Sequence, residues 1–182
     1  MNMDPIVYLD LKDELIKKGF GSEIEWAETV KRCDKAEDFC TEYIWVICNS
    51  GMKNQIAEII YQRILQAMCD NRDISEVFGH QGKVEAIKSM IKDHVSLFRK
   101  YLSAENKLEF CKSLPWIGDI TKYHLAKNLG ENCIKPDRHL VRIAEKYGLD
   151  AFSLCKKLAE VTGDRLHTVD VVLWRSGNLG LI

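Results

Sequence analysis

The stretch Leu114-Pro115-Trp116-Ile117-Gly118 predicts a tight turn between two segments that have helical sequence patterns. Proline and glycine punctuate helices, and here both lie between the periodic segments rather than inside them. The helix that follows the turn would present backbone N–H groups at its start, which form a ready site for a phosphate. Gly118 suits such a turn because the backbone must bend sharply and approach the phosphate closely.

A lone carboxylate follows a short distance downstream, in Lys135-Pro136-Asp137-Arg138-His139. Asp137 stands at the start of a predicted helix that Gly148 ends. Aspartate is favoured at helix N-termini for structural reasons alone, so one interpretation of Asp137 is a plain N-cap. The alternative is that its carboxylate acts on a nucleotide whose phosphate is held by the turn.

The rest of the chain is also predicted to be helical, which makes the fold all-α. Apolar residues recur at helical spacing, and no segment alternates as a strand of a hairpin sheet would. The expected helices cover residues 4–18, 22–30, 36–48, 55–69, 83–100, 104–113, 119–129, 137–147, 151–161 and 164–174. The segment 36–48 is the most apolar of these, so we expect it to be buried.

The composition is ordinary for a soluble globular protein, with 182 residues, 46% hydrophobic and 29% charged. No apolar run is long enough for a membrane span, and the first residues do not resemble a signal peptide. We therefore expect a cytoplasmic protein, associated with the nucleoid if its source is prokaryotic. The seven cysteines form no C-x-x-C pair, which favours reduced thiols.

The net charge of −1 hides an uneven distribution of charge. The segment 99–148 has ten Lys or Arg and six Asp or Glu, a net charge of +4, so the remainder carries −5. A basic segment on an otherwise acidic chain fits a localised phosphate-binding surface. A solvated helical surface is the alternative interpretation.

The turn and the downstream aspartate together resemble the helix-hairpin-helix DNA glycosylases, the superfamily of endonuclease III and the 8-oxoguanine glycosylases. The family hairpin is roughly Leu-Pro-Gly-(Val/Ile)-Gly, and this chain has a tryptophan, Trp116, in place of the first glycine. The resemblance is specific from about residue 108 to 148. It implies DNA contacts by Leu114, Trp116, Ile117, Gly118, Asp119, Ile120, Thr121, Lys122 and Arg138.

The same resemblance implies two helical lobes with the active cleft between them. Residues 22–130 would form the lobe with the helix-hairpin-helix, and residues 1–21 with 131–182 the lobe that carries Asp137 near the cleft. Asp137 matches the family's catalytic position. Breaking an N-glycosidic bond develops positive charge on the sugar, which a nearby carboxylate stabilises while it orients or activates water.

Bifunctional members of the family have a nucleophilic lysine two residues after the second hairpin glycine. The matching residue here is Ile120, so the resemblance implies a monofunctional enzyme without abasic-site lyase activity. Lys122 follows two residues later, which places it about 200° around the helix from Ile120. We expect Lys122 to face the DNA backbone or solvent.

Enzymes that act on a base in duplex DNA extrude it and fill the gap. In the family a loop after a buried helix supplies the filling side chain, and the corresponding break is Asn49-Ser50-Gly51-Met52. Asn49 or Met52 is the candidate wedge, and an ordinary turn between helices is the alternative. Pocket aromatics would come from Trp26, Tyr43 and Trp45, unless these belong to the core.

The sequence therefore predicts a base-excision repair glycosylase that hydrolyses the bond to a damaged or modified base in double-stranded DNA and leaves an abasic site. We expect a monomer with no metal. No iron–sulfur cluster is expected either, because its ligation needs several cysteines and only Cys155 lies near the C-terminus. The resemblance allows a monovalent cation at the hairpin. Two alternatives stay open: a DNA-binding protein without catalysis, and an enzyme that modifies a base without excising it. The pattern does not identify the base.

Overall fold

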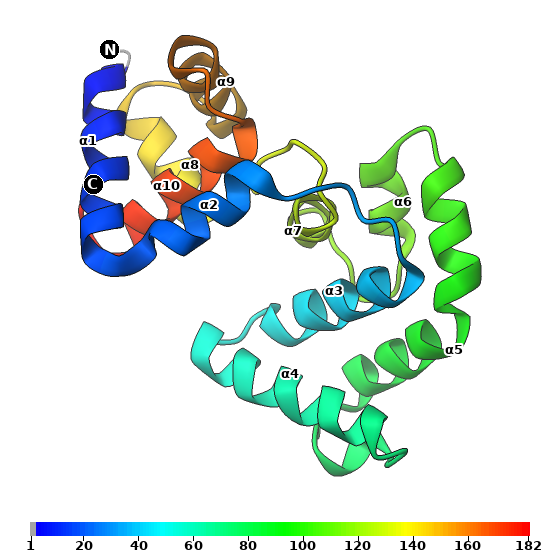
Figure 1. Ribbon diagram of the computed structural model, residues 1–182. Coiled ribbons are helices and arrows are strands. Elements are labelled where there is room, and N and C mark those ends of the chain that lie inside the picture. The colour runs from blue at the N-terminus through cyan, green and yellow to red at the C-terminus, as the bar shows by residue number, and fades with distance from the viewer. Residues whose placement is uncertain (1–2) are drawn as a thin grey trace. The chain divides into compact units, whose positions relative to one another are not determined.

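The computed structural model describes residues 3–182, and all regular secondary structure in that range is helical, as the sequence predicted (Figure 1). The helices are α1 (Pro5–Leu15), α2 (Gly21–Thr29), α3 (Ala36–Asn49), α4 (Asn54–Cys69), α5 (Gln81–Ser103), α6 (Lys107–Ser113), α7 (Thr121–Asn128), α8 (Arg138–Lys146), α9 (Ala151–Thr162) and α10 (Leu166–Asn178). A kinked segment, η1 (Ile16–Phe20), in which Gly19 has φ +92°, joins α1 to α2, and a 3-10 turn, η2 (Ile74–Glu76), precedes α5. Across the described residues, no helix combines the length and the apolarity that crossing a membrane requires.

The chain divides into two compact units. The terminal unit consists of Met1–Lys31 and Gly130–Ile182, and the central unit consists of Arg32–Leu129. The first boundary therefore differs from the one predicted at residue 22. The physical reason is that α2 packs against α10, so the segment that contains α2 belongs to the terminal unit.

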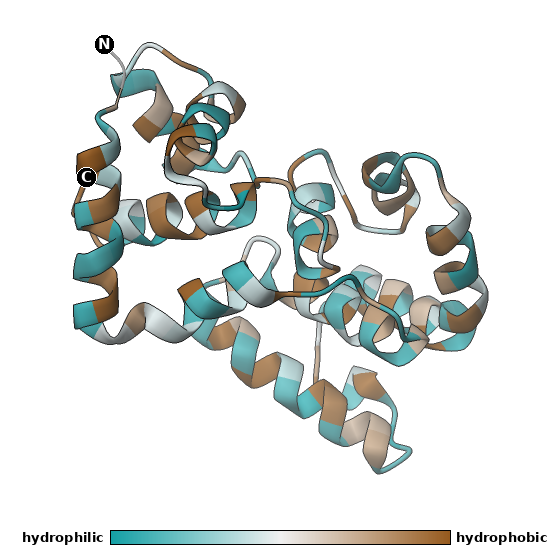
Figure 2. Ribbon diagram, turned by 45° about the horizontal axis from the view of Figure 1, so that its top comes forward, coloured by the Kyte–Doolittle hydropathy of each residue, from teal (hydrophilic) through white to brown (hydrophobic). Residues whose placement is uncertain are grey.

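In the terminal unit, α10 is the helix on which the others assemble, because it packs against α1, α2, α8 and α9. Its side chains Val169, Val172 and Leu173 are fully buried. Figure 2 shows hydrophobic and hydrophilic residues alternating along the helices, the pattern expected where one face of a helix is buried. Unusually for a core helix, α10 also buries the polar side chains His167, Thr168, Asp170 and Ser176.

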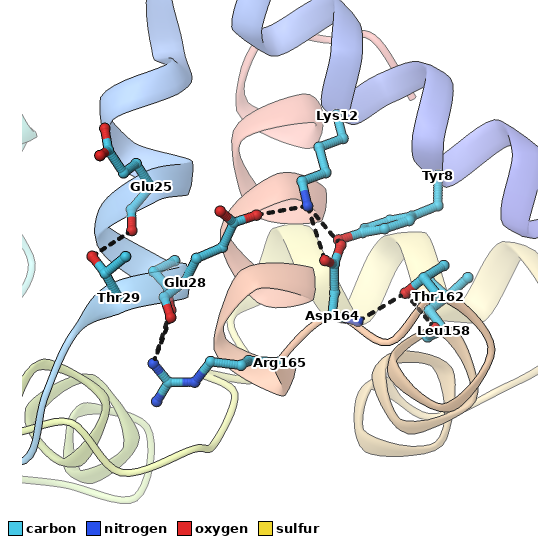
Figure 3. A network of polar contacts seen from close by, with 10 residues as sticks. Tyr8, Lys12, Glu25, Glu28, Thr29, Leu158, Thr162, Asp164 and Arg165 are labelled. Carbon is cyan, nitrogen blue, oxygen red and sulfur yellow. Dashed lines mark hydrogen bonds and ion pairs between the residues drawn. The ribbon is translucent and has the colours of Figure 1, made fainter.

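A polar network fixes α1 in the terminal unit (Figure 3). The Tyr8 hydroxyl donates to Asp164 Oδ2 at 2.6 Å, and Lys12 Nζ lies 2.9 Å from Asp164 and 2.7 Å from Glu28 Oε1. Burial of Tyr8 and its bond to Asp164 raise the pKa of the tyrosine hydroxyl, so the group stays protonated. Asp164 thus links α1 to the loop between α9 and α10.

In the central unit, α3 packs against α4, α5 and α7. Phe39, Tyr43, Ile44 and Ile47 are fully buried, which confirms the prediction of a buried helix over 36–48. The aromatic ring of Phe39 also contacts the ring of Phe98 on α5, with centroids 5.7 Å apart. Tyr43 belongs to this core, and its hydroxyl reaches the turn that follows α6.

Asp164→Ala is expected to lower the free energy of unfolding by about 2–3 kcal/mol, because it leaves the Tyr8 hydroxyl and the Lys12 ammonium without their shared, largely buried partner. Urea unfolding measures the change. The control is Glu160→Ala, which removes an exposed pair with Lys156 at 3.9 Å and should cost no more than about 0.5 kcal/mol. Equal losses for the two variants would contradict a special role for Asp164.

Candidate nucleic-acid interface and carboxylate

The predicted turn connects α6 and α7, which pack against each other in the central unit. The side chains of Leu114 and Ile117 are buried, so they anchor the turn to the core. Ile117 N donates to Leu114 O at 3.2 Å, and the Tyr43 hydroxyl donates to Pro115 O at 2.6 Å. The backbone of the turn is therefore fixed from inside the central unit.

Backbone N–H groups are available where α7 begins. Gly118 N donates to Thr121 Oγ1 at 2.7 Å, and Lys122 N donates to Gly118 O at 3.0 Å. The N–H groups of Asp119, Ile120 and Thr121 take part in none of the hydrogen bonds within the described residues. Unpaired donors at a helix start, together with the helix dipole, favour an anion there.

Trp116 stands in the turn with φ +61°, in the left-handed region that glycine favours. The backbone at this position is therefore one that the family's glycine could adopt. The indole lies against the start of α5, where a Cβ on Gly82 would be only 2.5 Å from Trp116 Cζ2. The ring also meets the His80 imidazole edge-on, with centroids 5.1 Å apart, while 52% of the residue stays exposed.

The lysines of the hairpin already have partners inside the central unit. Lys112 Nζ lies 2.6 Å from Asp119 Oδ1, and this bond lowers the pKa of Asp119. Lys122 Nζ lies 2.8 Å from Glu109 Oε1 and lowers the pKa of that carboxyl. The positive charges of these two lysines are matched locally.

Of the two surroundings predicted for Lys122, the DNA backbone or solvent, solvent is wrong, because the side chain is only 11% exposed. The face of α7 opposite Ile120 is the one that packs on α6, and this packing brings Lys122 to Glu109. Ile120 itself is the N-cap residue of α7 and is 43% exposed. The exposed residues of the turn are Pro115, Trp116, Gly118, Asp119 and Ile120.

Asp137 lies in the terminal unit and is the N-cap of α8, as both interpretations of the sequence require. Its Oδ1 accepts from His139 N at 2.9 Å and from Leu140 N at 3.2 Å. Its Oδ2 accepts no hydrogen bond from the described residues, and the side chain is half-buried. Arg138, the first residue of α8, is exposed. One carboxylate oxygen therefore caps the helix and the other is available.

The two candidate wedge residues lie in the loop between α3 and α4. Asn49 Nδ2 donates to Asn54 Oδ1 at 2.8 Å, which bridges the end of α3 and the start of α4. Met52 is half-buried, and Gly51 turns the chain with φ +71°. These contacts are typical of an ordered turn between helices. That Asn49 or Met52 fills the gap left by an extruded base stays a prediction.

Sequence reasoning missed two residues that shape the candidate site. Gly82 accommodates the ring of Trp116, and nothing in its local sequence indicates that contact. Asp170 is buried on α10 and accepts from Lys135 N, close to Asp137 in the chain. An acidic residue within the apolar run Val169-Asp170-Val171-Val172 was a signal that could have found it.

Gly82→Ala and Trp116→Gly are expected to be non-additive. In the Trp116→Gly background, Gly82→Ala should raise the free energy of unfolding by about 0.5–1 kcal/mol through the helix preference of alanine. In the wild type the gain should vanish, because the new Cβ meets the indole.

A double-mutant cycle in urea measures this coupling. Gly21→Ala, whose Cβ would meet Ile16 at an ordinary 3.8 Å, is the control and should add to Trp116→Gly without coupling. Additive effects of Gly82→Ala and Trp116→Gly would contradict the packing of the indole on α5.

Comparisons with known proteins assign no family to this chain. No protein-family model, no curated protein and no solved structure matches it. A functional conclusion therefore depends on the local geometry of the turn between α6 and α7 and of Asp137.

Proposed function

We propose that the protein is a monofunctional DNA glycosylase of the helix-hairpin-helix type, which excises a damaged or modified base from double-stranded DNA and leaves an abasic site. The observation that carries the proposal is the start of α7, where the N–H groups of Asp119, Ile120 and Thr121 have no partner among the described residues. They follow a turn in which Trp116, at the position of the family's first glycine, has φ +61°, a torsion that glycine favours.

These N–H groups would hold a backbone phosphate of DNA. Such contacts position a protein on DNA without reading its sequence. Because Lys112 and Lys122 already pair with Asp119 and Glu109, the amides and not the lysines would make the contact. The affinity would then depend less on salt than that of a site made of free lysines, because few counterions are released.

Asp137 is the residue proposed to act on the sugar. Oδ1 of Asp137 caps α8 at the positive end of the helix dipole, while Oδ2 accepts no hydrogen bond from the described residues. When the C1′–N bond breaks, the base leaves with the bonding electrons and the sugar becomes positively charged. Asp137 stabilises that charge, water adds to C1′, and the proton released by the water passes to the carboxylate.

Hydrolysis by water is proposed because the position of the family's lysine is Ile120, which has no amine. The nearest lysine along α7, Lys122, donates to Glu109 and is largely buried. An amine nucleophile needs an unprotonated, accessible nitrogen, and the bond to Glu109 raises the pKa of Lys122. We therefore propose no covalent intermediate between enzyme and sugar.

A second candidate is a DNA-binding protein that performs no chemistry. The observation that favours it is the ordinary cap geometry of Asp137, which an aspartate adopts at many helix starts. Phosphate binding at α7 would be the same in both candidates. Formation of abasic sites separates them.

Asp137→Asn is expected to lower the rate of base excision by at least about 100-fold, because asparagine caps the helix but has no charge to stabilise the sugar. Duplexes that each carry one lesion are incubated with the protein, treated with alkali and resolved by size. Asp150→Asn is the matched control, since Asp150 caps α9 in the same unit through Ser153 N at 3.0 Å.

The control variant should excise the same lesion at the wild-type rate. Excision that survives in Asp137→Asn would contradict the role given to Asp137. A covalent adduct trapped by borohydride would contradict hydrolysis by water. DNA binding without abasic sites on any lesion would support the second candidate instead.

A further inference from the structure

Helix α10 contains a buried carboxylate that the proposed chemistry does not use. Asp170 is 1% exposed and directly follows Val169, a residue of the apolar core of the terminal unit. A carboxylate in such surroundings is costly unless its oxygens accept hydrogen bonds. Asp170 Oδ2 accepts from Lys135 N at 3.2 Å, which ties α10 to the segment that precedes α8.

Lys135, whose N–H donates to Asp170, is linked in turn to Asp137 through its carbonyl oxygen. Lys135 O accepts from Asp137 N at 2.7 Å, so Lys135, Pro136 and Asp137 form a tight three-residue turn. Pro136 restricts the backbone within this turn because its ring fixes φ. The backbone of Lys135 therefore connects Asp170, which accepts from its N–H, to Asp137, whose N–H donates to its carbonyl oxygen and whose Oδ1 caps α8.

The same loop is held on α10 at a second point. Asn132 Oδ1 accepts from His167 N at 3.3 Å, at the first turn of α10. Between the two contacts, Ile134 is 1% exposed within the same core. The loop that precedes Asp137 is thus fixed on α10 by hydrogen bonds of the Asn132 and Asp170 side chains, and by burial of Ile134 between them.

We propose that Asp170 is a positioning residue for Asp137. It holds the peptide of Lys135 so that the carboxylate of Asp137 stays at the start of α8 with Oδ2 available. The catalytic part of this inference rests on the proposed function, whereas the effect on the backbone of Asp137 does not. Small displacements of a reacting group reduce rates strongly, so a residue that fixes the loop would affect excision without touching DNA.

Two measurements test the proposal on Asp170→Ala, Asp170→Asn and Thr168→Val. The first is amide hydrogen exchange at His139 and Leu140, the two amides that Asp137 caps. The second is the single-turnover rate of excision at saturating protein, with the dissociation constant for the duplex measured separately. Thr168→Val is the matched control, because Thr168 is fully buried on the same helix and its hydroxyl has no hydrogen-bond partner among residues 3–182.

Asp170→Ala should accelerate exchange at His139 and Leu140 by about tenfold, while Ser153, capped by Asp150 on α9, keeps its protection. Excision should slow by about 10- to 100-fold with an unchanged dissociation constant. Asp170→Asn keeps an acceptor oxygen and should restore most of both properties. If Asp170→Ala does not fold, Asp170→Ser removes the same bond with a smaller polar side chain.

Unchanged exchange at His139 and Leu140 in Asp170→Ala would overturn the proposal. An equal loss of excision in Thr168→Val would also overturn it, because it would show a general effect of changing α10. A wild-type protein that excises no lesion overturns the proposed function instead. The exchange measurement, made without DNA, then still decides whether Asp170 holds the backbone at Asp137.

Discussion

The packing of α10 against α1, α2, α8 and α9 is the interaction on which the terminal unit depends. It joins segments that the whole central unit separates in the chain, and it explains why α2 belongs with the C-terminal helices. The same helix holds the loop before α8 through Asp170 and through its own N–H at His167. The placement of Asp137 is therefore a consequence of how α10 is buried.

The central unit fixes the turn between α6 and α7, while three backbone N–H groups at the start of α7 have no partner among the described residues. Leu114 and Ile117 are buried, and Tyr43 binds the carbonyl of Pro115 from the core helix α3. Trp116 accepts a left-handed backbone, which costs a bulky residue about 1–2 kcal/mol, and its indole packs on α5. Fixed donors at a helix start bind an anion without the entropic cost of ordering lysine side chains.

Local sequence patterns predicted the helices well and the contacts between them poorly. The apolar periodicity of residues 36–48 predicted both the helix α3 and its burial, because the pattern lies within the segment itself. The predicted boundary at residue 22 failed because the partner of α2 lies in α10, far along the chain. Lys122 was misplaced for a similar reason, since the residue that binds it, Glu109, belongs to the neighbouring helix. The motif placed Asp137 at the start of a helix, which the structure confirms, whereas the contact between Asp170 and Lys135 depends on how distant segments pack.

If the start of α7 binds a phosphate of DNA, a ¹⁵N-resolved NMR titration detects the binding at the amides of that helix start. The titrant is a duplex with a non-cleavable abasic-site analogue, added to the uniformly labelled protein. We expect the amide signals of Asp119, Ile120 and Thr121 to shift progressively and saturate together. Saturating shifts on another surface, with these three signals unchanged, would contradict this expectation.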